Sequence, residues 1–154
     1  MVHSDPILVV FALECQRYAL PLAAAQTVAR AVEVTPLPKA PAIVLGVINV
    51  RGQIIPVLDI RQRFGLPQRE IDLSDQFIIA RTAKRAVALV VDRVVGVLTR
   101  PAEFVIASDA IVPGLDYVHG VVKLDDDLIF IHDLDTFLSL DEENALEEAL
   151  PTDG

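Results

Sequence analysis

Short runs of apolar residues, many of them alternating with polar ones, follow one another along this chain of 154 residues. Between residues 17 and 22, for example, Tyr18, Leu20 and Leu22 occupy every second position, which is the period of a β-strand. Such runs, separated by turn residues, predict about ten short strands and therefore an all-β barrel or sandwich. The clearest runs cover residues 7–13, 18–22, 47–50, 53–59, 76–81, 86–91, 93–99, 118–124 and 128–131.

Some segments do not follow the simple strand pattern. Residues 26–34 are ambiguous, because their alanines permit a helix whereas their valines favour a strand. Residues 42–45 predict one helical turn that ends at Gly46. Pro56 lies inside the strand 53–59, so we expect that strand to be a sheet edge or to carry an irregularity. A short amphipathic turn is expected at 61–66, and loops are expected at 67–75 and 102–116.

At the C-terminal end the apolar period changes from that of a strand to that of a helix. Leu146 and Leu150 lie four positions apart on one stripe, and five acidic residues occupy other positions. Ser139 and Glu142 have the spacing of a capping box at the helix start. We therefore expect a terminal helix over residues 141–150.

The charge of the chain is concentrated in one part of it. The formal net charge is −9, but residues 125–154 hold eleven acidic residues and no Lys or Arg. Residues 1–124 therefore carry thirteen basic and eleven acidic residues, a net of +2. Clustered basic residues, which nucleic acids and anionic membranes require, are absent from this pattern. The acidic end is expected to confer solubility, or alternatively to steer a basic partner.

No arrangement of residues in the sequence predicts catalysis or a cofactor. Cys15 is the single cysteine and excludes an intramolecular disulfide. The three histidines and the acidic run 125–127 lack the spacing of metal ligands, so no metal site is expected. Asp59 and Asp92 each follow an apolar strand, and caps of turns explain such residues better than a catalytic pair does. We expect a protein that is not an enzyme.

The segment 46–60 carries the most distinctive pattern, G-V-I-N-V-R-G-Q-I-I-P-V-L-D-I. Two apolar strands flank the turn Arg51-Gly52, in which Gly52 permits a positive φ angle. Arg51 would then project from a rigid hairpin beside apolar neighbours, as an anchor of a protein interface does. An ordinary solvated arginine is the alternative interpretation.

This segment resembles the signature of the CheW-like family of chemotaxis coupling proteins, roughly G-V-x-N-x-R-G-x-I-x-P-V-x-D-L. Nine positions match, and Ile60 stands for the final Leu. The resemblance extends to A-L-V-V-D-R-V at 88–94, to Y-V-H-G-V at 117–121 and to L-I-F-I-H-D-L at 128–134. It implies two intertwined five-stranded SH3-like β-barrels with a C-terminal helix. Residues 7–140 would form the CheW-like domain, and 141–154 an acidic helix and tail.

The family resemblance also implies a function and a site. Members are non-catalytic signalling adaptors that couple chemoreceptors of the methyl-accepting type to the regulatory domain of a CheA-like histidine kinase. The family often has a Glu where Thr27 stands, so Arg51 would lack that carboxylate as a partner. The kinase-binding residues are not assigned. The receptor-binding residues carried over from the family are Val28, Asn49, Val50, Arg51 and Gly52.

A different class of function remains as the alternative. A small-molecule-binding β-barrel would need an apolar cavity with a few convergent polar groups, and no such polar cluster is evident in the sequence. The N-terminus has no signal-peptide pattern, and no apolar run is long enough to span a membrane. These features predict a cytoplasmic protein without a cofactor that is recruited to receptor clusters.

Overall fold

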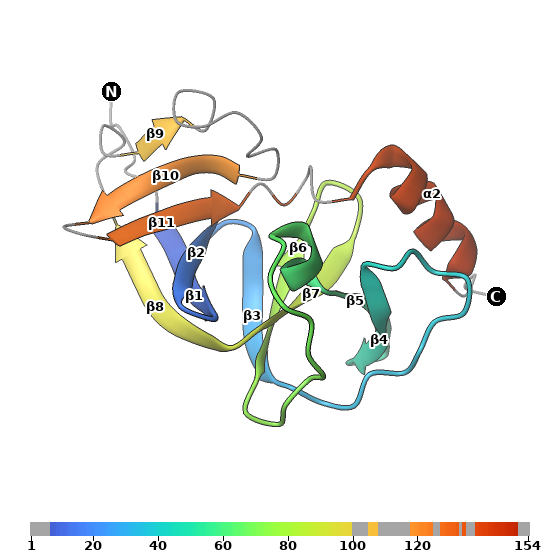
Figure 1. Cartoon of the computed structure of the whole chain (residues 1–154). Coiled ribbons are helices and arrows are strands. Elements are labelled where there is room, and N and C mark those ends of the chain that lie inside the picture. The colour runs from blue at the N-terminus through green and yellow to red at the C-terminus, as the bar shows by residue number, and fades with distance from the viewer. Residues whose placement is uncertain are drawn as a thin grey trace.

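A computed structural model describes residues 7–99, 105–107, 118–124, 127–132, 134 and 138–150, and its strands form two sheets (Figure 1). The six-stranded sheet has the order β8-β1-β2-β11-β10-β9, and the five-stranded sheet has the order β3-β6-β7-β5-β4. The first consists of β1 (Ile7–Leu13), β2 (Gln16–Pro21), β8 (Arg93–Thr99), β9 (Val105–Ala107), β10 (Val118–Leu124) and β11 (Asp127–His132). The second consists of β3 (Ala25–Arg30), β4 (Val44–Val50), β5 (Gln53–Leu58), β6 (Gln76–Arg81) and β7 (Ala86–Val91).

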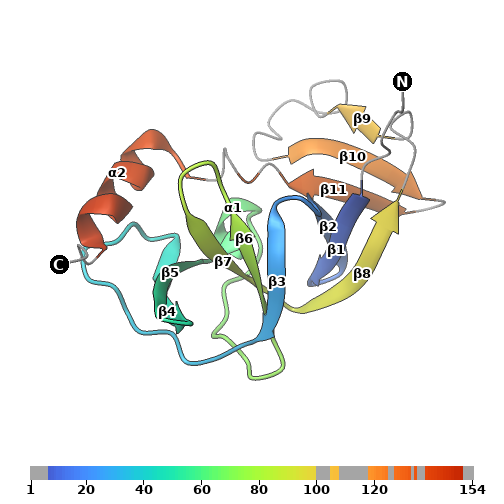
Figure 2. The same cartoon turned by 180° about the vertical axis from the view of Figure 1, so that it is seen from behind.

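The chain passes from one sheet to the other and back, as the two opposite views show (Figures 1 and 2). It forms β1 and β2 of the six-stranded sheet, then all five strands of the second sheet, and returns at β8. This arrangement confirms the predicted all-β class with two intertwined units and a terminal helix. One sheet has six strands where five were expected, because β9 lies in a segment expected to be a loop.

Neither sheet closes into a complete barrel through its strands as the structure describes them. The two edge strands of the five-stranded sheet, β3 and β4, are connected instead by the segment that follows β3. In that segment Thr35 forms an isolated bridge with Val47 of β4, through hydrogen bonds of 2.9 and 2.8 Å. The sheet is thus curved into a barrel-like shape that a single bridge completes.

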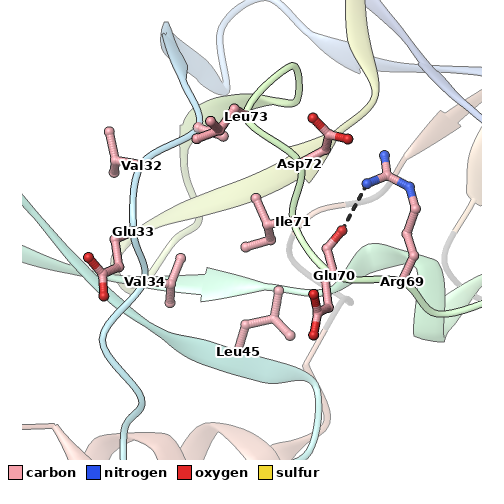
Figure 3. Close-up of a pocket in the computed structure, with 10 residues that line it drawn as sticks. Val32, Glu33, Val34, Leu45, Arg69, Glu70, Ile71, Asp72 and Leu73 are labelled. Atoms are coloured by element: carbon pink, nitrogen blue, oxygen red, sulfur yellow. Dashed lines mark hydrogen bonds between the residues drawn. The ribbon is translucent and has the colours of Figure 1, made fainter.

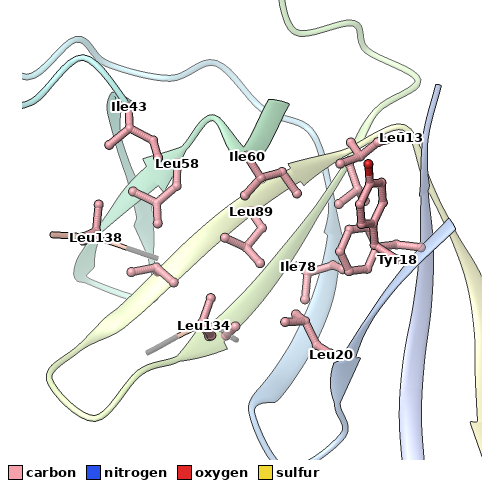
Figure 4. Packing of buried hydrophobic residues seen from close by; sticks show 14 of the residues in the cluster. Leu13, Tyr18, Leu20, Ile43, Leu58, Ile60, Ile78, Leu89, Leu134 and Leu138 are labelled. Atoms are coloured by element: carbon pink, nitrogen blue, oxygen red, sulfur yellow. The ribbon is translucent and has the colours of Figure 1, made fainter. Parts of the chain in front are cut away.

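A shared hydrophobic core lies between the two sheets (Figure 4). Leu13, Tyr18 and Leu20 of the six-stranded sheet meet Ile78 and Leu89 of the five-stranded sheet. The shared core also includes Leu134, Leu138 and Leu146 from the C-terminal part of the chain. Each sheet has a second, smaller core of its own on its other side. Burial on both faces explains why several strands are apolar at nearly every position.

In the first half of the five-stranded sheet, the structure resolves one ambiguous prediction and corrects another. The ambiguous stretch 26–34 forms strand β3 over its first part and no helix. The helical turn expected at 42–45 is wrong, because β4 begins at Val44 and Gly46 lies inside it. A Cβ atom at Gly46 would lie 2.2 Å from the carbonyl oxygen of Thr35. Gly46 therefore permits the close approach of the bridging segment and does not end a helix.

Pro56 causes no sheet edge, since β5 lies between β4 and β7. The parallel pairing of β5 with β7 covers only Val57 and Leu58, so Pro56 precedes the paired part of the strand. Its partner in β4 is Val47, close to the register shift between Val44 and Gly46. The expected edge is therefore absent, and the irregularity nearest to Pro56 is a bulge in the partner strand β4, opposite Val57 and Leu58.

Two helices complete the described fold. Helix α1 (Ile60–Arg63) follows β5 directly, and the Asp59 carboxylate caps it by accepting a hydrogen bond from the Arg61 N–H at 3.2 Å. Helix α2 (Leu140–Ala149) begins at Ser139 with the predicted capping box. It starts one residue earlier than expected and ends at Leu150. The Leu146 side chain is fully buried, so α2 packs into the shared core.

Candidate interaction site

The turn between β4 and β5 is a tight two-residue hairpin turn. Arg51 and Gly52 both have positive φ angles, +53° and +82°, as the central residues of a type I′ turn do. The Asn49 side chain stabilises the turn, because its Oδ1 accepts a hydrogen bond of 2.9 Å from the Gly52 N–H. The positive φ angle expected at Gly52 is confirmed. Asn49 and Gly52 of the signature segment both stabilise the turn, through their hydrogen bond.

Arg51 projects from this turn into solvent. It forms no hydrogen bond or ion pair with any residue of the described part of the chain, Thr27 included. Its neighbours are the half-buried Val50 and the exposed Ile54, so a guanidinium group and apolar surface lie together at the tip of a rigid hairpin. Such a tip can bind a partner that offers a carboxylate beside apolar side chains.

The five predicted receptor-binding residues lie on two elements of the five-stranded sheet, the β4–β5 hairpin and β3. Asn49, Val50, Arg51 and Gly52 are consecutive at one edge of the five-stranded sheet. Val28 lies on β3 at the opposite edge, with 41% of its surface exposed. β3 and β4 are the two ends of the strand order, and the Thr35–Val47 bridge connects the segment that follows β3 to β4. Because the sheet is curved, its two edge strands approach each other at this bridge, and a common receptor-binding surface of all five residues stays a prediction.

A second exposed apolar surface lies along β8, the edge strand of the six-stranded sheet. Alternate residues of β8 are exposed, namely Arg93, Val95, Val97 and Thr99. Val97 is 64% exposed, and its register partner on β1 is Val9. Sequence reasoning predicted this strand but not its exposed face. In a strand, alternate side chains lie on opposite faces, but the sequence of β8 does not show which of its two faces is exposed to solvent.

An ion-pair network lies where the chain passes between the two sheets. The buried guanidinium of Arg61 donates to the carboxylates of Glu14, in the β1–β2 turn, and of Asp92, between β7 and β8. Asp92 also accepts hydrogen bonds from the Glu14 N–H at 2.8 Å and from Arg69 at 2.7 Å. Burial alone would raise the pKa of Asp92, but these hydrogen bonds outweigh it and lower the pKa.

Arg69 extends this network into the loop between α1 and β6. Its guanidinium donates to both oxygens of the buried Asp75 carboxylate, at 2.8 and 2.7 Å. Asp92 is therefore occupied by two arginines, and Asp59 caps α1. Asp59 is a strand-end cap, as the sequence indicated, whereas the ion pairs of Asp92 with Arg61 and Arg69 were not predicted. The hydrogen bonds of both carboxylates thus explain their positions by a structural role.

The described residues contain no group of three or more His, Cys, Asp or Glu arranged to hold a metal ion. Within that same part of the chain, no helix has the length and hydropathy needed to cross a membrane.

The chain belongs to the CheW-like family, because the family model of the CheW-like domain matches residues 8–142. This match confirms the resemblance seen in the signature segment, and it places the Arg51 turn, β8 and the Asp92 network inside one family domain.

Several relatives of this chain are named chemotaxis protein CheW. The chain is 34% identical to the chemotaxis protein CheW of Thermotoga maritima over 118 residues, which is 77% of this chain and 76% of that protein. It is 28% identical to the chemotaxis protein CheW of Bacillus subtilis over 152 residues, 97% and 96% of the two chains. The crystal structure of the scaffolding protein TtCheW from Thermoanaerobacter tengcongensis is similar, with a TM-score of 0.81 and 29% identity. That similarity covers 90% of this chain and 95% of TtCheW.

Proposed function

We propose that this protein is a non-catalytic signalling adaptor that couples chemoreceptors of the methyl-accepting type to a CheA-like histidine kinase. Its relatives are chemotaxis and scaffolding proteins, and the two exposed surfaces described above suit an adaptor with two partners. Binding to receptors would recruit it to receptor clusters. The observation that carries the proposal is Arg51 at the tip of a rigid hairpin, where it has no partner in the described part of the chain.

The receptor arm of the proposal uses the Arg51 turn. An exposed arginine without an internal partner loses no ion pair of its own when it binds a carboxylate of another protein. The type I′ turn restricts the backbone beside it, so little backbone entropy is lost on binding. Asn49 and Gly52 contribute by holding the turn, and Val50 adds apolar contact.

The kinase arm uses the exposed face of β8. An edge strand with exposed Val95 and Val97 offers both free backbone groups and apolar side chains to another β-domain. The regulatory domain of a CheA-like kinase has the same fold by family resemblance, so strand-to-strand contact between the two domains is feasible. We assign this arm to Val95 and Val97.

The two arms can be tested with one pair of variants. Arg51→Ala should weaken binding to a receptor cytoplasmic fragment by about tenfold and leave kinase binding unchanged. Val97→Asp should show the reverse pattern, because it places an unpaired charge in an apolar contact. Binding is measured by isothermal titration calorimetry, and coupling by kinase autophosphorylation with receptor-containing vesicles.

Arg81→Ala is the matched control, because Arg81 is also exposed and belongs to β6, which contributes neither the β4–β5 turn nor the face of β8. It should change neither affinity by more than about twofold. Loss of both affinities in both variants, with the thermal transition lowered, would show that these residues maintain the fold. Normal coupling by Arg51→Ala would contradict the receptor arm.

A further inference from the structure

A hollow of about 420 Å³ lies between the segment after β3 and the loop before β6 (Figure 3). Val34, Leu45 and Ile71 lie around the same space in Figure 3. Val32 and Leu73 are more exposed, at 53% and 88%, and belong to the same lining. The hollow is therefore an apolar surface that the described part of the chain leaves open to solvent.

Leu45 reaches the hollow because β4 is irregular at this position. The register of β4 with β5 shifts between Val44 and Gly46, which leaves Leu45 without a partner residue on β5. Such a bulge redirects a side chain, and Leu45 is exposed between the two buried residues Val44 and Gly46. The irregularity that accommodates the bridging segment also turns an apolar side chain outward.

The segment beside the hollow has backbone groups available for pairing. It is fixed at both ends, by the hydrogen bond from the Ala31 N–H to the Asp75 carbonyl at 3.0 Å and by the Thr35–Val47 bridge. Between these anchors, residues 32–34 form no hydrogen bond with any described residue. An unpaired stretch of backbone on a fixed segment is a surface to which an extended peptide can add.

The margin of the hollow is acidic. Glu33, Glu70 and Asp72 are exposed members of its lining. The single basic residue in the lining, Arg69, is already bound to Asp75, to Asp92 and to the Glu70 carbonyl. Its charge is therefore compensated within the protein, and a ligand meets uncompensated carboxylates around apolar side chains.

We propose that this hollow is a third docking surface, which binds an extended segment of a partner protein in which apolar residues alternate with Lys or Arg. The apolar side chains contact Leu45 and Ile71, the basic side chains pair with Glu33 and Glu70, and the peptide backbone pairs with residues 32–34. This surface is separate from the Arg51 turn and from β8, so its test is independent of the coupling assays.

The probe is a short synthetic peptide that alternates lysine and valine, added to the full chain labelled with ¹⁵N. We expect amide shifts to concentrate at residues 31–34, 45 and 69–73. Glu70→Lys and Val32→Ser should each weaken binding by about fivefold, because the first removes an acidic contact and the second an apolar contact of the peptide. Both residues are exposed, so the circular dichroism spectrum should be unchanged.

Glu148→Lys is the matched control, since it makes the same charge change on an exposed residue of α2. It should alter the affinity by no more than about twofold. The proposal is overturned if Glu148→Lys weakens binding as much as Glu70→Lys, or if a peptide alternating glutamate and valine binds equally well. Shifts outside the hollow, or occupation by an uncharged apolar dye without peptide binding, would also overturn it.

Discussion

At the scale of single residues, Arg51 has a backbone conformation that favours glycine, whereas the proposed receptor binding requires its arginine side chain. Its φ angle of +53° lies in the left-handed region, which costs an L-residue with a Cβ atom about 1 kcal/mol relative to glycine. The hydrogen bond from the Gly52 N–H to Asn49 partly offsets that cost. An arginine at a position that suits glycine is explained if its side chain binds a partner.

Arg51→Gly should therefore stabilise the protein and weaken it as an adaptor. We expect the free energy of unfolding to rise by up to about 1 kcal/mol, because glycine adopts this φ without strain. The entropy that glycine adds to the unfolded chain reduces the gain. Urea unfolding and receptor binding measured on the same sample test both effects. Gly52→Ala at φ +82° is the opposite control and should destabilise; a loss of stability in Arg51→Gly would contradict the strain at Arg51.

At the scale of elements, α2 shows how a short acidic helix is held to the rest of the molecule. Glu142 pairs with Arg63, and Arg85 donates to Glu143 at 3.3 Å and to Glu147 at 3.5 Å. Three acidic residues of α2 thus face arginines of the same chain. Within α2, Asp141 and Glu148 are exposed and have no ion-pair partner among the described residues. If the acidic end steers a basic partner, these two residues are therefore the ones in α2 available to it.

The N-cap of α2 has a measurable effect on stability. Ser139→Ala removes the hydroxyl that accepts a 3.1 Å hydrogen bond from the Glu142 N–H, and should cost about 1 kcal/mol. Ser139→Asp should retain most of the stability, because aspartate is also a good N-cap. Thermal unfolding and amide exchange in α2 measure the change. Equal stability of Ser139→Ala and the unaltered chain would show that burial of Leu146 and the ion pairs with Arg63 and Arg85 hold the helix without the cap.

At the scale of the whole molecule, the Asp92 network connects parts that are distant in the sequence. Glu14 lies in the β1–β2 turn, Arg61 in α1, Arg69 in the loop before β6, and Asp92 between β7 and β8. The network therefore spans the point where the chain returns to its first sheet. Together with the shared core, it resists separation of the two sheets.

The network should make stability depend on pH in the acid range. Because the pKa of Asp92 is lower in the folded protein than its ordinary value of 3.8, its contribution is present above that value and is lost as the pH falls through the folded pKa. Asp92→Asn should cost about 2 kcal/mol at neutral pH, and the cost should shrink below about pH 4. Urea unfolding between pH 7 and 3 measures it.

Glu148→Gln is the control for this experiment, because Glu148 is exposed and has no ion-pair partner among the described residues. Its stability should follow that of the unaltered chain at every pH. A difference between Asp92→Asn and the unaltered chain that stays constant from pH 7 to pH 3 would show that Asp92 acts only through packing.

Local signals predicted the elements well where one physical effect dominates. The strands at 76–81, 86–91 and 93–99 match β6, β7 and β8, and the capping box at Ser139 is as expected. Gly46 was misread as a helix end, because a glycine that permits a close backbone approach looks the same in the sequence. Of the candidate site, the turn at Arg51 was predictable, whereas the exposed face of β8 and the hollow at Leu45 were not.

The amino-acid sequence by itself determined the all-β class, the terminal helix, the tight turn at Arg51 and membership of the CheW-like family. The first three depend on neighbours within a few positions, through side-chain period, capping and turn geometry, whereas family membership depends on the residue pattern along most of the chain. The tertiary structure decided which face of each strand is buried. In β1, for example, Phe11 enters the shared core and Val10 the core of its own sheet. When a strand has apolar residues on both faces, either face can be packed into either core, so only the packing of strands distant in the sequence decides which core each face enters. The same packing leaves one face of β8 and the hollow at Leu45 exposed.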